Sequence, residues 1–105
     1  MKAIKKAKLE KLGYRVTDAK AFLGLTEVEM ALIRIRHSLA QSLLAERERQ
    51  SASQLDIAKM IGSSQSRVAK MEAGDPSVSL DLLIRSLLAI GSPAKRIAQA
   101  IGKAS

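Results

Sequence analysis

The spacing of apolar residues along the chain predicts a series of short helices. From Thr26 onwards, apolar positions recur at steps of three and four residues, which places them on one side of an α-helix. Serine, glycine and proline separate these stretches at the positions where helices would begin and end. β-Branched residues rarely alternate with polar ones, so no strand is expected. The pattern therefore predicts an all-α protein.

Five helices are expected between residues 26 and 105. The first begins at Thr26, which is expected to form a capping box with Glu29, and runs to about Arg49. It carries a wide apolar face, on which His37 is expected to be a half-buried packing residue. The other four helices are expected within residues 53–62, 64–74, 79–91 and 92–102.

Two of these helix starts have specific predicted caps. Ser53 is expected to cap the second helix, with Asp56 at the third position as the acidic member of a capping box. Ser92 is expected to cap the last helix, with Pro93 at its first helical position, where a missing N–H does no harm.

The second and third helices are joined by so short a turn that they must cross closely. Ala58 has to stay small at that crossing, because a larger side chain would hold the two helices apart. The apolar residues expected in the core of this pair are Leu55, Ile57, Ile61, Val68 and Met71. Met30 and Met60 are also expected to fill the core.

The positive charge is concentrated at the two ends of the chain. The net charge is +8; residues 1–20 contribute +5 (seven bases, two acids), residues 95–105 contribute +3, and residues 21–94 hold eight of each sign. Such a balance favours an anionic partner, with nucleic acid first. The basic N-terminal extension, residues 1–25, has a weak apolar stripe and a short helical turn expected over 17–23. Its lysines can serve as a solvated tail or contact DNA.

The composition argues against catalysis, metal binding and membrane insertion. There is no cysteine and His37 is the only histidine, so disulfides and thiolate ligands are excluded. Glu27/Glu29 and Glu46/Glu48 are pairs two residues apart, which places each pair on diverging sides of a helix. We expect no enzymatic activity, no cofactor and no metal. No apolar stretch reaches transmembrane length and no signal peptide is visible, which predicts a cytoplasmic protein.

The third helix has an outward side suited to a DNA groove. At about 100° per residue, Val68 and Met71 face the core. The residues that face or flank the opposite side are Gln65, Ser66, Arg67 and Lys70. Glutamine can bond an adenine edge with both amide atoms, and arginine or lysine can bond N7 and O6 of guanine. We expect this helix to enter the major groove; the alternative is an exposed face that serves only solubility.

The same region resembles a known family. The helix-turn-helix of phage-repressor-like (Xre, Cro/cI-type) regulators has the spacing seen here for Gln54, Ile57, Ala58, Ile61, Gly62, Val68 and Met71. The stretch SSQSRVAKMEAGDPSVSLDLLIRSLLAIG is similar to the subgroup that includes HigA-like antitoxins and small stand-alone repressors. The resemblance covers about residues 26–91. It implies a lambda-repressor-like five-helix bundle, with residues 26–105 as the DNA-binding domain.

The resemblance also implies roles for individual residues. Three are implied to hold DNA phosphates: Gln54, Ser63 and Ser64. Those implied to contact bases are Gln65, Ser66, Lys70 and Arg67, the last of which could also reach a phosphate. Family members often pair an arginine late in the first long helix with a glutamate that ends the recognition helix. In this chain the pair would be Arg47 and Glu72.

One turn departs from the family pattern. The residues before the second helix usually read Gly-Leu-Thr-Gln, whereas this chain reads Ser51-Ala52-Ser53-Gln54. If the first of these positions needs a positive φ, Ser51 is strained there. We expect this turn to be looser or built differently.

Together these features predict a sequence-specific transcriptional regulator that acts on double-stranded DNA as a repressor. One recognition helix reads only about four base pairs, so we expect a homodimer that places two such helices roughly 34 Å apart. The dimer surface is expected around Leu87, Ile90, Ile97 and Ile101. The alternative is an antitoxin of a type II pair that neutralises a toxin ribonuclease through residues 1–25.

Overall fold

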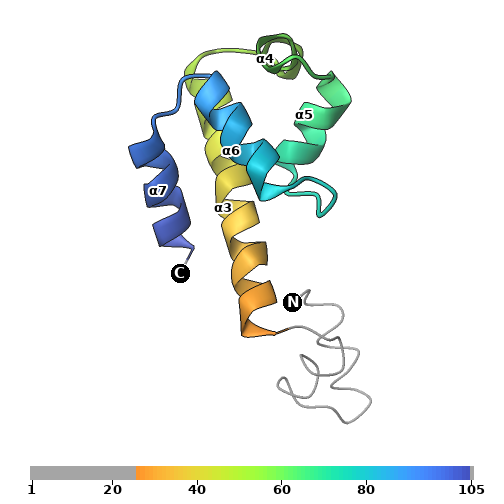
Figure 1. Ribbon diagram of the computed structural model, residues 1–105. Helices are drawn as coiled ribbons and strands as arrows, with labels where there is room; N and C mark the ends of the chain where they lie inside the picture. The colour runs from red at the N-terminus through yellow and green to blue at the C-terminus, as the bar shows by residue number, and fades with distance from the viewer. Residues whose placement is uncertain (1–25, 105) are drawn as a thin grey trace. The chain divides into compact units, whose positions relative to one another are not determined.

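The computed structural model describes residues 26–104, which form five α-helices and no strand (Figure 1). The helices are α3 (Glu27–Arg49), α4 (Gln54–Ile61), α5 (Gln65–Glu72), α6 (Leu80–Ala89) and α7 (Ala94–Lys103). The all-α prediction and the five expected helices are confirmed. The short helical turn expected over 17–23, like the rest of the N-terminal extension, lies outside the described residues.

The chain divides into two compact units, of which the first ends at Ile33 and the second begins at Arg34. In the first unit, the Glu29 backbone N–H donates to Thr26 Oγ1 at 3.0 Å, so Thr26 caps α3 as expected. Val28 and Ile33 are exposed in this unit, although the sequence pattern placed Ile33 on a buried face. Apolar periodicity identifies one side of a helix, but it does not show how far along the helix that side is covered.

The second unit contains a core of Leu, Ile, Val, Ala and Met. Its buried apolar residues are Leu39, Ala40, Leu43, Ile57, Ala58, Val68, Met71, Val78, Leu83, Leu87, Ile90, Ile97 and Ala100. Ile101 packs against this cluster. The predicted dimer surface is therefore wrong, because Leu87, Ile90 and Ile97 are already buried inside a single chain.

Several other burial predictions are also wrong. His37 is exposed rather than half-buried, and Leu55 and Met60 on α4 are about half exposed, at 48% and 50%. Leu55 and Met60 lie at helical spacings that fit the core pattern, but the buried residues of α4 are only Ile57 and Ala58. Met71, in contrast, is fully buried as predicted.

Helices α3 to α6 all end in the same hydrogen-bonded turn. In each, two N–H groups beyond the helix return to carbonyl groups of its last turn, as when Ala52 N donates to Arg47 O and Ser51 N to Glu48 O. This Schellman turn places one residue in the left-handed region, where glycine is favoured. Glycines occupy that position after α4, α5 and α6, whereas after α3 it is Ser51, with φ of +54°. The suspected strain at Ser51 therefore has a structural basis.

The start of α7 differs from its prediction. Ser92 is buried, and its N–H donates to Leu87 O at 2.9 Å, so it completes the turn that ends α6. Pro93 has φ −73° and ψ 154°, and it is the N-cap rather than the first helical residue. Its carbonyl accepts the first helical hydrogen bonds of α7, from Arg96 and Ile97.

A buried glutamate fastens α7 to the end of α3. Glu46 Oε1 accepts a hydrogen bond from Arg96 Nη1 at 2.9 Å, and Oε2 accepts from Gln50 Nε2 at 2.9 Å and from Arg49. Gln50 Nε2 also donates to Ile90 O at 2.7 Å. The hydrogen bond from Gln50 and the charges of the two arginines lower the pKa of Glu46, although burial opposes them. The carboxylate therefore stays charged and ties three segments together.

We expect Ser51→Gly to raise the free energy of unfolding by about 1 kcal/mol. A left-handed backbone costs a non-glycine residue about 1–2 kcal/mol, and the greater freedom of glycine in the unfolded chain offsets part of the gain. Urea denaturation measures the change. Ser51→Ala is the control, because it keeps a Cβ in the same conformation; an equal gain for both variants would contradict the strain at Ser51.

Candidate nucleic-acid interface

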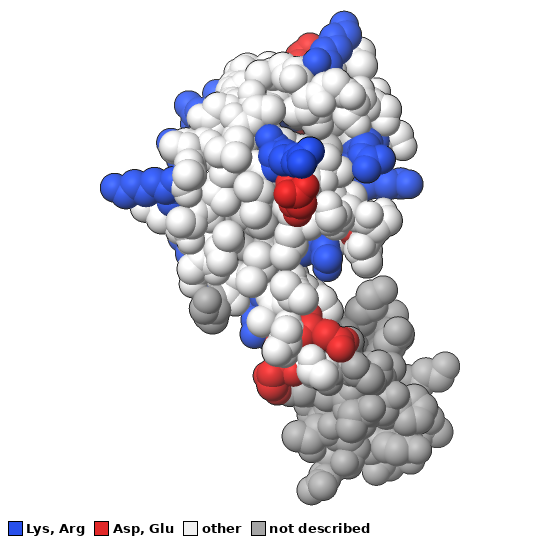
Figure 2. Space-filling model, viewed as in Figure 1, with Lys and Arg blue, Asp and Glu red and all other residues white. Residues whose placement is uncertain are grey.

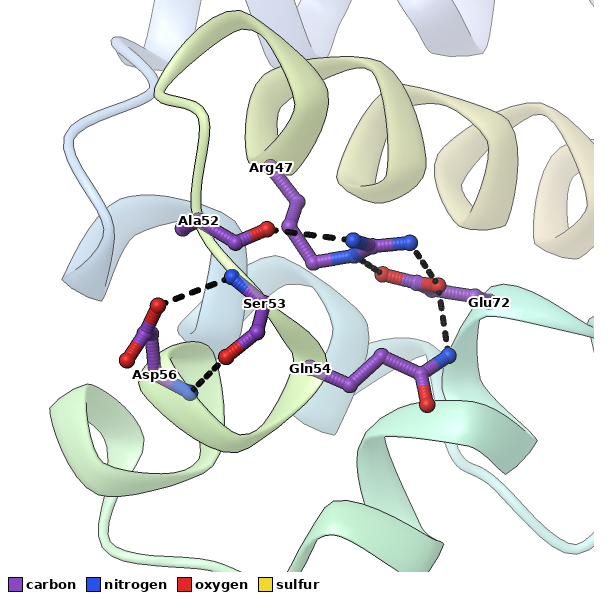
Figure 3. Close-up of polar contacts among 6 residues, drawn as sticks. All are labelled: Arg47, Ala52, Ser53, Gln54, Asp56 and Glu72. Atoms are coloured by element: carbon purple, nitrogen blue, oxygen red, sulfur yellow. Dashed lines mark hydrogen bonds and ion pairs between the residues drawn. The ribbon is translucent and has the colours of Figure 1, made fainter.

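The first helix of the pair, α4, begins with the predicted capping box. The Asp56 N–H donates to Ser53 Oγ at 3.0 Å, and the Ser53 N–H donates to Asp56 Oδ2 at 2.9 Å (Figure 3). These hydrogen bonds lower the pKa of Asp56. The local sequence predicts this start completely, because both partners lie within four residues of each other.

A tight turn then leads from α4 into α5. Gly62 has φ of +67°, and the Ser63 N–H donates to Ala58 O at 2.8 Å. Ser64 is the N-cap of α5, and its Oγ accepts a hydrogen bond from the Arg67 N–H at 3.1 Å. The Ser64 hydroxyl can still donate its proton to a hydrogen-bond acceptor such as a phosphate oxygen. Ala58 is 1% exposed, so the two helices cross with only a methyl group at that position.

Helix α5 has one buried and one exposed side. Val68 and Met71 are fully buried. The side chains that the sequence predicts to contact bases are all exposed: Gln65, Ser66, Arg67 and Lys70. Arg67 and Lys70 form no ion pair with any described residue. Lys and Arg side chains project at the right-hand edge of Figure 2, on the side where Figure 1 places α5.

A hollow of about 270 Å³ runs beside this exposed side. Ser66, Arg67 and Lys70 line it together with Ser77, which comes from the loop between α5 and α6. The loop is held in place by Arg36, whose Nε donates to Val78 O at 3.1 Å. Sequence reasoning did not identify Ser77, because its closeness to α5 arises only when the loop folds back.

Asp75 is the acidic group of the same loop. The Ser77 N–H donates to Asp75 Oδ1 at 2.8 Å, and hydrogen bonds with Ser77, together with the charge of Lys70, lower the pKa of Asp75. The Asp75 carboxylate offsets part of the positive charge of Lys70 on the loop side of the hollow. The positive charge is therefore strongest on the α5 side, at Arg67 and Lys70. An anionic ligand would therefore have to approach from the α5 side of the hollow.

The predicted partners Arg47 and Glu72 lie together beneath this pair of helices. Arg47 Nε donates to Glu72 Oε2 at 2.5 Å and Nη2 to Glu72 Oε1 at 3.0 Å, a two-pronged ion pair with side chains 18% and 7% exposed (Figure 3). Arg47 Nη1 also donates to Ala52 O at 3.1 Å. The hydrogen bond and charge of Glu72 raise the pKa of Arg47. The end of α3 is thereby joined to the end of α5.

Gln54 belongs to the same cluster. Its Nε2 donates to Glu72 Oε1 at 3.0 Å, so the side-chain amide of this residue points toward the ion pair (Figure 3). The sequence placed Gln54 among the phosphate contacts, but it gave no indication of this internal bond. Gln54 is half-buried and still has an unused amide oxygen and a second amide proton. It positions α4 on α5 whether or not it also touches DNA.

Comparison with known proteins identifies the domain. A family model described as helix-turn-helix matches residues 43–97, which is 55 of the 105 residues and spans the end of α3 through the first part of α7. The chain belongs to this Xre-like helix-turn-helix family. It is a DNA-binding helix-turn-helix regulator, and domains of this kind are typically not enzymes. No matching curated relative and no matching solved structure was found.

The family assignment agrees with the geometry. In a helix-turn-helix protein the second helix of the motif lies in the major groove. That helix is α5 here, the one with the exposed polar side. Within the described residues, no group of three or more metal-ligating side chains gathers, and no helix is long and apolar enough to cross a membrane.

We expect Arg47→Ala to lower the free energy of unfolding by about 3 kcal/mol, because it leaves the nearly buried Glu72 carboxylate without its cation. Thermal and urea melts measure the loss. Arg85→Ala is the matched control, since Arg85 pairs with Asp81 at the surface, with side chains 77% and 75% exposed. Its removal should change stability by less than about 0.5 kcal/mol. Similar losses for the two variants would contradict the structural role of Arg47.

Proposed function

We propose that this protein is a sequence-specific transcriptional repressor of the cytoplasm, with residues 26–105 as its DNA-binding domain. The observation that carries this proposal is the exposed polar side of α5. It presents one amide, one guanidinium, one ammonium and one hydroxyl group, and no acidic residue of α5 lies on that side. Helix α5 would lie in the major groove.

The side chains of α5 have the chemistry that base recognition requires. Gln65 stands at the start of the helix, where residues reach deepest into the groove in this type of docking. Its amide can pair with adenine, and Arg67 or Lys70 can pair with guanine. Ser66 and Ala69 are small, so that the helix can approach the base edges closely. We therefore assign base contacts to Gln65, Ser66, Arg67 and Lys70.

We assign phosphate contacts to the turn before α5 and to the start of α4. Ser63 and Ser64 offer hydroxyl and backbone N–H groups at the start of α5, and Gln54 offers the unused part of its amide. Helix starts favour anions because their N–H groups and dipole point outward.

We propose that the protein acts as a homodimer. A single α5 reads too few base pairs to specify one genomic site, and two-fold pairing of the protein doubles the sequence that is read. The dimer surface must differ from the buried residues first expected. On α6 and α7, Leu88 is the exposed large apolar residue and supports a contact at that end of α6.

The antitoxin alternative shares the DNA-binding part of this proposal. It assigns toxin binding to residues 1–25, which lie outside the described residues. The two functions differ in what residues 1–25 do, and the described contacts support only the activity that they have in common.

Selection from a random pool of duplexes by the purified protein tests the proposed function. We expect enrichment of a palindrome with half-sites about one helical turn apart, since two copies of α5 would face the same side of the DNA. Selection is carried out at near-physiological salt. Binding without enrichment, and with a steep salt dependence, would show that the positive charge holds phosphates only.

We expect Gln65→Ala and Lys70→Ala each to weaken operator binding by about 1–3 kcal/mol and to relax the preference at one base position. Fluorescence anisotropy with the selected duplex and its single-base variants measures both effects. Lys95→Ala is the control, because Lys95 is an exposed cation on α7. If all three variants lose affinity equally and keep the same preference, α5 does not read the bases.

A further inference from the structure

A second charged surface lies between α3 and α7, away from the proposed DNA face. A groove of about 450 Å³ runs along these two helices; we call it the α3–α7 groove. In Figure 1, α7 and α5 lie on opposite sides of α6. The groove is therefore not part of the surface assigned to DNA.

The floor of the groove is made of small side chains. Ser38, Ser42 and Ala45 come from one side of α3, and Ala100 comes from α7. Ser38 Oγ donates to Ala100 O at 2.6 Å, which holds the two helices together along the floor. Small residues along a valley between two helices allow a third helix to pack closely into it.

The rim of the groove is positively charged. Arg49, Arg96 and Lys103 line it, and their only acidic neighbour in the groove is Glu46, which leaves a net charge of +2 (three cations minus one carboxylate). The side chains of Arg49 and Arg96 are 63% and 52% exposed. Each gives hydrogen bonds to the buried Glu46, but a guanidinium has five N–H groups, so most of them remain free. Lys103 has no ion-pair partner among the described residues.

Ion pairs with Glu46 hold the guanidinium groups of these two arginines in place at the surface. The carboxylate is 3% exposed and receives one bond from Arg49 on α3 and one from Arg96 on α7. The two guanidinium groups are thereby held at the same end of the groove, with Lys103 about two turns further along α7. A partner that places acidic groups at these two points would meet cations that are already ordered, which reduces the entropy lost on binding.

The charge of the groove selects among its potential occupants. If the groove were itself a two-fold dimer surface, it would face the groove of the second copy, and a net charge of +2 would meet the same charge. The N-terminal extension is equally unsuited, because residues 1–20 carry seven bases and only two acids. A duplex has the right charge, but it is too wide to reach a floor of small side chains between two helices. An acidic helix satisfies both the charge and the shape.

We propose that the α3–α7 groove binds an acidic amphipathic helix of a partner protein, with its apolar side on Ser42, Ala45 and Ala100 and its carboxylates on Arg49, Arg96 and Lys103. This interaction adds a protein partner to the proposed DNA-binding function and does not depend on it. It leaves α5 free, so that the partner and DNA can be bound together.

A pair of synthetic helical peptides tests the proposal on the full chain. One peptide has leucine and alanine along one side and glutamate on both flanks; the other has lysine in place of every glutamate. Each is titrated into ¹⁵N-labelled protein and followed by amide chemical shifts. We expect the glutamate peptide alone to bind, with shifts at Ser42 and Ala100 and none at Gln65 or Lys70.

Charge variants on α7 then locate the site. We expect Lys103→Glu to weaken the glutamate peptide about fivefold or more, and the matched Lys95→Glu, on the same helix outside the groove, to change it by less than about twofold. Lys103→Gln should give an intermediate loss without placing an acid at the end of α7. Circular dichroism melts establish that all three variants are folded.

Several outcomes would overturn the proposal. These are equal binding of the two peptides, shifts that centre on α5, or equal effects of Lys103→Glu and Lys95→Glu. Shifts of groove residues on dilution without peptide would instead identify a second copy as the occupant. Broadening of groove signals by a nitroxide on Ala3→Cys would identify the N-terminal extension. Operator binding by Lys103→Glu should equal that of the unmodified protein, so failure of the groove and failure of DNA recognition are distinguished.

Discussion

The ion pair between Arg47 and Glu72 is the constraint on which the arrangement of α3, α4 and α5 depends. It joins the end of α3 to the end of α5, and Gln54 brings α4 into the same contact. The buried apolar residues Ile57, Ala58, Val68 and Met71 also hold α4 and α5 on the core, but they form no directional bond to the end of α3. Because both charges are largely buried, neither can be left alone without a large loss of stability. The position of the exposed side of α5 thus rests on a polar contact beneath it.

The parts of the fold that could be predicted from the sequence are those set by neighbouring residues. The capping box of Ser53 and Asp56, the cap at Ser64 and the left-handed glycine at position 62 depend on groups a few residues apart. The exposed side of α5 follows from helical geometry once those ends are known. The ion pair could be named only through a family resemblance, since 25 residues separate its partners.

The sequence did not predict which apolar side chains stay exposed, because that depends on how much of each helix the neighbouring helices cover. Leu55, Met60 and Leu88 fit an apolar pattern, yet they lie where no other described helix covers them. The same limitation affected the dimer surface, because an apolar residue on a late helix serves the core of one chain as well as an interface. Ser77 and Glu46 were missed for the related reason that their contacts come from distant segments. The apolar pattern of a sequence shows which side of a helix is buried, whereas the packing of the other helices decides how much of each side chain is buried.

Two adjacent residues of α3 explain how one helix serves two surfaces. Glu46 and Arg47 point about 100° apart around the helix, as successive residues must. Arg47 therefore reaches α5, whereas Glu46 reaches α7 through Arg96. Both ion pairs involve residues in the last turn of α3, so a rotation or shift of that turn would loosen α5 and the α3–α7 groove together. Because both ion pairs start from the same helix, α3 keeps the two surfaces in a fixed relation, and the proposal that DNA and a partner are bound together requires this.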